Sequence, residues 1–303
     1  MRVFLTGGSG FLGQHLERRL IEDGHSVIAP TSRECDLRSS NDLMKFNDAY
    51  DVIFHLAAYT QAGDWCLTHP GEQWIVNQQI NTNVLNWWQE QGPAVRMVAI
   101  GTSCSYAPAS DLVETQYMNG EPIESLYTYA MTKRMLLQGL RAINYQYDLD
   151  YLYVVPSTLY GPGYHQDGRQ MHFIFDLIRK ILRGREFGET VTLWGDGHQS
   201  REIVHVDDFI TNLFGLFNSG ASDIYNLGSG TEFSIREFAK VICELTNFEI
   251  DRIEFDTSKY VGAKSKVLNI SKSKALLPNY ADRNLESGIR EVIDWFEKTK
   301  FFY

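Results

Sequence analysis

The chain has 303 residues, of which 44% are hydrophobic and 22% are charged, and its formal net charge is −10. This composition is ordinary for a globular protein with one large or two modest domains. The negative charge and the lack of a Lys/Arg block argue against a nucleic-acid partner. No apolar run approaches the ~20 residues of a membrane span, and the first residues read as a strand rather than a signal peptide. We therefore expect a cytoplasmic protein with no membrane partner.

The first half of the chain alternates predicted strands and helices. Strands are expected at 2–5, 25–29, 51–58, 95–100 and 151–156. Helices are expected where Leu12, Leu16 and Leu20 recur, at 72–91 and at 128–146. Runs of Val, Ile and Leu in these strands predict a parallel sheet that helices cover on both faces. The expected fold class is therefore α/β, a Rossmann-type doubly wound sheet with a smaller C-terminal α/β substrate domain.

After about residue 160 the pattern changes. The predicted elements are a helix with an apolar stripe from Ile174 to Leu182, strands at 191–194, 201–206 and 223–228, a helix that Ser234 and Glu237 begin as a capping box, and a final amphipathic helix through Ile289 and Phe296. We expect the dinucleotide-binding domain at 1–164 and 201–229. The substrate domain is expected at 165–200 and 230–303.

A glycine loop, "TGGSGFLG", follows the first predicted strand and opens the first predicted helix. Gly7, Gly10 and Gly13 allow a tight turn and a close approach of the backbone to a pyrophosphate, which the N-terminus of the helix attracts. Phe11 and Leu12 belong to the same predicted cofactor loop. A plain glycine turn is the alternative interpretation. The position of the loop between a strand and a helix favours dinucleotide binding.

Arg33 stands about 20 residues beyond the loop, where NAD-binding proteins often carry an acidic residue. A guanidinium is a fixed positive charge with donors that suit the 2′-phosphate of NADP. The sequence therefore favours NADP(H) over NAD. A solvated surface arginine is the alternative.

Tyr129 and Lys133, in "YAMTK", are four residues apart and share one face of a predicted helix. A nearby ammonium lowers the pKa of a tyrosine and makes it a usable proton donor and acceptor. Together with the glycine loop, this pair resembles the short-chain dehydrogenase/reductase superfamily. The stretches "HLAA", "LYGPG" and "REIVHVDD" point to its extended branch, the NAD-dependent epimerase/dehydratases, which act on nucleotide sugars.

Within that branch the chain resembles the GDP-L-fucose synthase family, in "GTSCSYAP", "NGEPIESLYTYAMTKR" and "LWGDGHQSRE". The resemblance implies an NADPH-dependent 3,5-epimerase and 4-reductase of a GDP-4-keto-6-deoxy-hexose. It assigns Cys104 and His172 as base and acid of the epimerisation, Thr102 and Tyr129 as the reductive pair, and Lys133 to both catalysis and the cofactor. The implied cofactor contacts also include Asp36, Leu37, Leu56 and Ala57, and the implied substrate contacts are Arg201, Trp194 and Lys259.

Departures from the family pattern concern the sugar site. Thr158 stands where the family has an asparagine, the segment 59–65 differs, and no proline follows His172 closely. A simple nucleotide-sugar 4-epimerase or 4-ketoreductase and a catalytically inactive NADP-binding regulator are the alternatives. The four cysteines, among them Cys35, show no CxxC spacing, so no metal is expected. The resemblance also implies a homodimer that pairs through two helices of each subunit.

Overall fold

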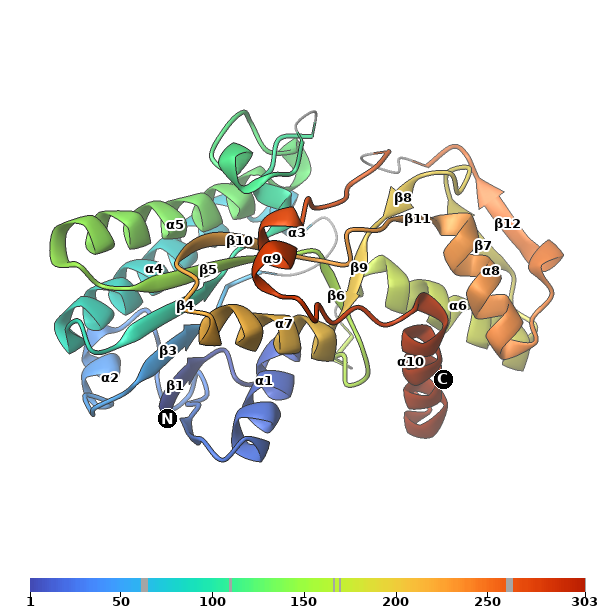
Figure 1. The fold of residues 1–303 in the computed structure, drawn as a ribbon. Helices are drawn as coiled ribbons and strands as arrows, with labels where there is room; N and C mark the ends of the chain where they lie inside the picture. The colour runs from blue at the N-terminus through green and yellow to red at the C-terminus, as the bar shows by residue number, and fades with distance from the viewer. Residues whose placement is uncertain (61–64, 109–110, 166, 169, 260–263, 303) are drawn as a thin grey trace.

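The computed structural model describes residues 1–60, 65–108, 111–165, 167–168, 170–259 and 264–302 (Figure 1). A sheet of six parallel strands, in the order β10-β5-β4-β3-β1-β2, forms its larger part. The strands are β1 (Arg2–Thr6), β2 (Ser26–Ile28), β3 (Val52–His55), β4 (Arg96–Ile100), β5 (Tyr151–Pro156) and β10 (Asp223–Leu227). The predicted parallel sheet is confirmed.

Helices cover both faces of this sheet (Figure 1). One face carries α2 (Ser40–Met44), α4 (Pro70–Gln91) and α5 (Tyr127–Tyr147), and the other carries α1 (Phe11–Glu22) and α7 (Val206–Asn218). Successive residues of a strand point to opposite faces. Phe4 of β1 accordingly packs in the core with Trp87, whereas Val3 and Leu5 pack in the core with Leu16 and Phe209. The doubly wound fold class is therefore confirmed.

A second hydrophobic core is built mainly from later segments, whose elements lie beside the sheet (Figure 1). Its elements are α6 (Phe173–Phe187), β7 (Val191–Trp194), β8 (Ser200–Arg201), β11 (Phe233–Ser234), α8 (Ile235–Thr246), β12 (Ile253–Asp256) and α10 (Leu285–Thr299). Strands β7 and β12 pair in parallel, and β8 pairs antiparallel with β11. The capping box of Ser234 and Glu237 at the start of α8 is confirmed.

The stretch 201–206 differs from the single strand that was predicted. Arg201 ends β8, β9 covers Ile203–His205 and pairs with β6 (Thr158–Tyr160), and Val206 already begins α7. The chain changes its pairing partner at Glu202, from β11 on one side to β6 on the other. The Glu202 carboxylate turns inward there and accepts hydrogen bonds from the backbone N–H groups of Gly230 and Leu268. The sequence analysis did not predict α7, which begins at Val206, inside the stretch that was predicted as a strand.

The short helices α3 (Trp65–Thr68) and α9 (Ser271–Leu276) were also not predicted. Helix α9 packs on the large sheet, where Lys272 Nζ donates to the carbonyl of Ile224 and Ser273 Oγ donates to that of Asn226. Part of the segment assigned to the substrate domain thus contacts β10. The division into domains stays a prediction. In the described part of the chain, no helix is long and apolar enough to cross a bilayer.

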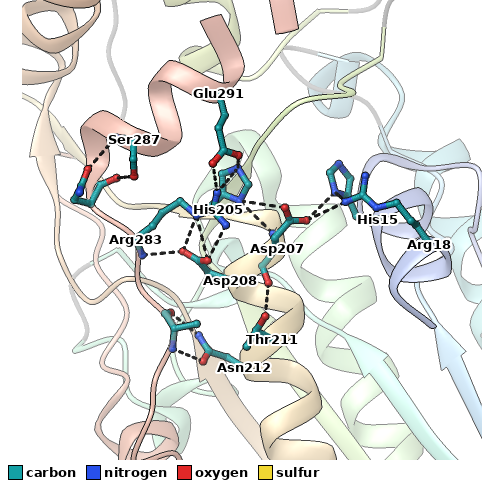
Figure 2. Close-up of polar contacts among 12 residues, drawn as sticks. His15, Arg18, His205, Asp207, Asp208, Thr211, Asn212, Arg283, Ser287 and Glu291 are labelled. Carbon is teal, nitrogen blue, oxygen red and sulfur yellow. Dashed lines mark hydrogen bonds and ion pairs between the residues drawn. The ribbon is translucent and has the colours of Figure 1, made fainter. Parts of the chain in front are cut away.

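A polar network joins α1, the start of α7 and the C-terminal segment (Figure 2). His15 Nδ1 lies 3.0 Å from Asp207 Oδ1, and Arg283 Nη2 donates to Asp208 Oδ1 at 3.0 Å. Arg283 Nη1 also donates to Glu291 Oε1 of α10 at 2.6 Å. These contacts connect α10, which packs in the second core, to α7 and α1, which cover one face of the large sheet.

The same network contains the group of side chains that best suits a metal ion among the described residues: His205, Asp207 and Glu291. Arg283 Nη1 lies 3.4 Å from His205 Nε2 and bonds to Glu291, so a cation already neutralises this group. We propose no metal site here, and the expected absence of a metal stays a prediction.

Candidate active site

The glycine loop lies at the carboxyl end of β1 and packs tightly against the end of β3. Gly7 has φ +74°, and a Cβ on it would lie 2.8 Å from the backbone nitrogen of Ala57. A Cβ on Gly13 would lie 2.1 Å from the carbonyl oxygen of Gly7. Larger residues therefore do not fit at either position. Gly10 is the N-cap of α1 and makes no side-chain cap, so the first N–H groups of the helix can bind a phosphate.

The end of β3 is held against the loop by Thr6. Thr6 Oγ1 accepts hydrogen bonds from the backbone N–H groups of Leu56 and Ala57, each at 3.2 Å, and lies 2.9 Å from His55 Nδ1. Burial, with a smaller effect from Lys133, lowers the pKa of His55 to about 4, so this imidazole is neutral near pH 7. Leu56 and Ala57 thus border the predicted cofactor loop, and His55 has a structural position beneath it.

The segment after β2 presents the residues predicted to recognise the adenosine end of the cofactor. Arg33 is exposed, and its guanidinium has no ion pair with any described side chain. Asp36 accepts hydrogen bonds from Arg38, whose Nη2 lies 2.7 Å from Asp36 Oδ2. Leu37 packs on the core, and its carbonyl accepts a hydrogen bond from Asn83 Nδ2 at 3.0 Å. Arg33 is thus a cation available to a ligand, and its predicted role stays a prediction.

Lys133 and Tyr129 both project from α5, as their spacing predicted, but one electrostatic expectation was wrong. Lys133 Nζ donates to the carbonyl oxygen of Ile100 at 2.8 Å, and burial lowers its pKa to about 8. The pKa of Tyr129 is raised, first by burial and then by Cys104. The phenol is cut off from water, and the Lys133 ammonium is directed at the carbonyl of Ile100 instead. Tyr129 is therefore protonated at neutral pH.

A cleft of about 720 Å³ collects four of the five predicted catalytic side chains. Thr102 and Cys104 follow β4, Tyr129 comes from α5, and His172 comes from the start of α6. Gly10, Phe11 and Leu12 line the same cleft. It therefore runs from the glycine loop to these four groups, at the carboxyl ends of the strands, where ligands of doubly wound sheets bind.

Cys104 lies in a short 3₁₀ helix, Ser103–Ser105, that Thr102 caps. Thr102 Oγ1 accepts a hydrogen bond from the backbone N–H of Cys104 at 3.2 Å. The Lys266 ammonium nitrogen lies 3.2 Å from the Cys104 sulfur. Burial by itself raises the pKa of the thiol, but the charge of Lys266 and hydrogen bonds from Thr102 and Lys266 outweigh it, so the pKa is lowered. The thiolate form of Cys104 is therefore electrostatically favoured over that of a free cysteine.

His172 precedes α6 as its N-cap residue, and its backbone N–H donates to Tyr164 Oη at 3.4 Å. The side chain keeps an exposed outer surface, but its ring lies within the crowded cleft. The surrounding protein atoms lower the pKa of His172, and His165 and Lys266 lower it further. The imidazole is thus a weaker base than a free histidine and a stronger acid when protonated.

The three candidate substrate residues lie in different places. Arg201 lines a cavity of about 490 Å³ that also contains Cys104 and Lys266. Trp194 is 56% exposed and lines a cavity of about 590 Å³ beside α6. Lys259 is exposed in the turn after β12 and lines none of these three cavities, as far as the described residues define them. Residues 61–64 of the divergent segment lie outside the described residues.

Comparison with known proteins identifies the family. The model of the NAD dependent epimerase/dehydratase family matches residues 3–228. The chain belongs to this family. GDP-L-fucose synthase 1 of Arabidopsis thaliana is 29% identical over 98% of this chain and 93% of its own length. GDP-L-colitose synthase of Yersinia pseudotuberculosis is 26% identical over 99% of both chains. The crystal structure of a GDP-L-fucose synthetase from Naegleria fowleri bound to NADP has a TM-score of 0.85 at 22% identity, over 99% of this chain and 94% of that one, and this likeness shows the fold.

The resemblance predicted from the motifs is thus confirmed for this epimerase/dehydratase. Sequence reasoning missed two lysines that the structure brings to the cavities. Lys180 lines the cavity of Trp194, and its Nζ lies 2.9 Å from Asp176 Oδ2. The signal for it was a basic pair, Arg179 and Lys180, on the polar side of an amphipathic helix. Lys266 had no local signal, because only the fold brings it to Cys104.

Proposed function

We propose that the protein is an NADPH-dependent 3,5-epimerase and 4-reductase of a GDP-4-keto-6-deoxy-hexose. The observation that carries the proposal is the single cleft lined by Cys104, His172, Thr102 and Tyr129, with Lys266 against the sulfur. A thiolate and an imidazole are a base and an acid for epimerisation, and a hydroxyl pair suits carbonyl reduction. The curated relatives named GDP-L-fucose synthase, matched over nearly their whole length, support the same activity.

Epimerisation uses the acidity of protons next to the C4 ketone. The Cys104 thiolate takes the proton from C3 or C5, and the electron pair of the broken C–H bond becomes an enolate. The protonated form of His172, which the lowered pKa makes a stronger acid, returns a proton to the same carbon from the opposite face, and this inverts the carbon. Exchange with solvent restores the thiolate and the imidazolium before the next inversion. The lowered pKa of the thiol favours the form that the first step needs.

Reduction uses the hydroxyl pair on the other side of the ketone. NADPH, when bound, supplies the hydride to C4. Tyr129 donates its phenolic proton to the forming alkoxide, and its raised pKa keeps that proton in place at neutral pH. Thr102 holds the C4 oxygen by a hydrogen bond. Lys133, fixed by its bond to the carbonyl of Ile100, orients the nicotinamide ribose.

The residues present fit NADP. The close packing at Gly7 and Gly13 leaves a backbone cradle for a pyrophosphate, and Arg33 offers an exposed guanidinium to the 2′-phosphate. Arg201 would bind the diphosphate of the sugar nucleotide, because its guanidinium can bond two oxygens at once. Trp194 and Lys180 would contact the nucleoside, since they line the adjoining cavity.

A nucleotide-sugar 4-epimerase is the alternative. The UDP-glucose 4-epimerase of Thermotoga maritima has the same TM-score, 0.85, so the fold does not separate the two activities. Cys104 beside Lys266 favours the 3,5-epimerase, because a 4-epimerase recycles its bound NAD and needs no such base. Incubation with GDP- and dTDP-4-keto-6-deoxy sugars, followed by NADPH absorbance, tests the proposal. NADPH oxidation with the GDP sugars supports the proposal. Co-purified NAD together with 4-epimerisation would identify a 4-epimerase instead, and NADP binding without turnover would indicate an inactive regulator.

We also infer a cytoplasmic homodimer that pairs through α4 and α5. Residues 73–89 of α4 contain no Asp, Glu, Lys or Arg, although Trp74 is 39% exposed and Ile75 is 57% exposed. An uncharged, partly apolar helix surface favours burial against a second copy. The four cysteines are free thiols, which agrees with a reducing compartment. Sedimentation of the wild type and of Ile75→Lys checks the pairing, and a wild-type monomer would exclude it.

A further inference from the structure

The segment 264–268 borders the cleft and the neighbouring cavity, and it carries Lys266 to the Cys104 thiol. Lys266 is 162 positions from Cys104 in the chain, and its Nζ lies 3.2 Å from the sulfur. Both residues line the cleft and the neighbouring cavity. Lys266 is thus the cation in direct contact with the sulfur among the described residues.

Two carboxylates hold this segment by its backbone. Glu232 Oε2 accepts a hydrogen bond from Ser265 Oγ at 2.7 Å and one from the backbone N–H of Lys266 at 3.3 Å. Glu202 Oε2 accepts the backbone N–H of Leu268 at 2.8 Å. The segment is therefore fixed immediately before and after the residue that reaches the thiol.

Glu202 is the more constrained of the two anchors. Its side chain is buried, and its second oxygen, Oε1, accepts the backbone N–H of Gly230 at 2.7 Å. A Cβ on Gly228 would lie 2.1 Å from the same oxygen, so the carboxylate occupies the space that a side chain there would need. Glu202 thus joins three segments: the break between β8 and β9, the turn after β10, and the segment of Lys266.

We propose that Lys266 is a positioning residue that maintains Cys104 as the thiolate base, and that Glu202 positions Lys266 by anchoring the backbone of its segment. The inference rests on the proposed role of Cys104. Lys266 does not itself exchange a proton with the substrate in this scheme. Its charge stabilises the anion that does, and the two hydrogen bonds of Glu202 keep the ammonium within contact distance.

The other charged or titratable groups around Cys104 do not replace Lys266. Tyr129 and His172 line the same cleft, and Arg201 and Asp111 line the neighbouring cavity. Tyr129 is protonated at neutral pH, and His172 has a lowered pKa, so neither supplies a fixed positive charge. Arg201 donates to the carbonyl of Ser200 at 2.7 Å. An ammonium in contact with the sulfur is therefore the feature that sets the thiol apart.

The first test measures the thiol without any substrate. The rate of Cys104 alkylation by iodoacetamide is followed from pH 5 to pH 10 on the full chain, with the modified residue resolved by peptide mass spectrometry. In Lys266→Met the midpoint of the pH profile should rise by about one unit or more, and Lys266→Arg should restore most of it. Lys264→Met is the matched control, because Lys264 is an exposed residue of the same segment. Superimposed profiles for the wild type and Lys266→Met would overturn the proposal.

The second test addresses Glu202. Glu202→Gln keeps the size of the side chain but leaves only one oxygen to accept the two backbone N–H groups. Its alkylation profile should shift in the same direction as that of Lys266→Met, and the double variant should shift no further than Lys266→Met alone. Additive shifts, or an unshifted profile in a folded Glu202→Gln, would refute the positioning role. Should Glu202→Gln not fold, Glu202→Asp, whose shorter carboxylate retracts from Leu268, is measured instead with the same expectations.

These outcomes are separate from the fate of the proposed function. Suppose that the midpoint rises in Lys266→Met but proton exchange is undiminished in a Cys104 variant. Lys266 would then stabilise the Cys104 thiolate as proposed, but Cys104 would not be the epimerisation base. If instead the midpoint is unshifted and the Cys104 variant loses exchange, Cys104 would be the base but Lys266 would not position or stabilise it.

Discussion

The guanidinium of Arg283 and the carboxylate of Asp208 form a nearly buried ion pair between the C-terminal segment and α7 (Figure 2). The backbone N–H of Arg283 donates to Asp208 Oδ2 at 2.8 Å, and its Nη2 donates to Oδ1 at 3.0 Å. The side chains are 24% and 12% exposed, respectively. The pair therefore holds the segment that leads into α10 against α7, a helix that covers the large sheet.

Removing one partner of this pair should destabilise the fold. Arg283→Met leaves the Asp208 charge nearly buried without its counter-ion, and we expect the free energy of unfolding to fall by about 3 kcal/mol. Arg290→Met is the control, because Arg290 and Glu286 form an exposed pair that should contribute less than about 0.5 kcal/mol. Urea unfolding of the three proteins measures both values. Equal small losses in the two variants would mean that the buried pair does not hold the segment.

Glu202 should make stability depend on pH. Burial raises the pKa of Glu202 from 4.5 to about 7, against the opposing effect of the backbone N–H groups. Because the folded pKa lies above the unfolded one, the favourable contribution is complete below pH 4.5 and is lost as pH rises through about 7. The difference in unfolding free energy between the wild type and Glu202→Gln should fall by on the order of 3 kcal/mol over this window. Parallel stability curves for the two proteins would contradict the shift.

Arg33 should decide the choice of cofactor. In Arg33→Ala, loss of the charged contact to the 2′-phosphate should weaken NADPH binding by about 1–3 kcal/mol and leave NADH binding unchanged. Arg38→Ala is the comparison, because Arg38 is a nearby arginine already bonded to Asp36. Titration of cofactor fluorescence gives the affinities of the wild type and of both variants for NADPH and for NADH. A loss confined to Arg38→Ala would transfer the role to that residue, and equal affinity of the wild type for both cofactors would exclude NADPH selectivity.

Tyr129 should be necessary for reduction and not for folding. Tyr129→Phe removes only the proton donor, and we expect NADPH oxidation with the keto sugar to slow about 10²–10⁴-fold, with cofactor binding retained. Tyr127→Phe, two residues earlier and 41% exposed, should behave as the wild type. Near wild-type turnover in Tyr129→Phe would show that another group protonates the alkoxide.

Local patterns in the sequence predicted most of the fold and the residues of the candidate site, but not the contacts between distant residues that set their charge states. The glycine loop, the strands and the Tyr129–Lys133 spacing depend on neighbours within a few residues, so they were predictable. The contact of Lys266 with Cys104 was not, because it joins residues 162 positions apart. The predicted lowering of the Tyr129 pKa was also wrong, because burial, which raises it, is a property of the assembled cleft. The break of the predicted strand at Glu202 was not predictable for the same reason, since the strands that pair on either side of it, β11 and β6, are in distant segments.

The central claim is that Cys104 is the epimerisation base, and proton exchange at the substrate carbons tests it most directly. In D₂O without NADPH, the wild type should introduce deuterium at C3 and C5 of the GDP-4-keto-6-deoxy sugar. Cys104→Ser has nearly the same shape, but a hydroxyl ionises far less readily than a thiol with a reference pKa of about 8.5. The variant should exchange about 10²–10⁴-fold more slowly, with NADPH binding intact, and Cys243→Ser, in the second core, should exchange as the wild type. Exchange at both carbons at the wild-type rate in Cys104→Ser would contradict the account.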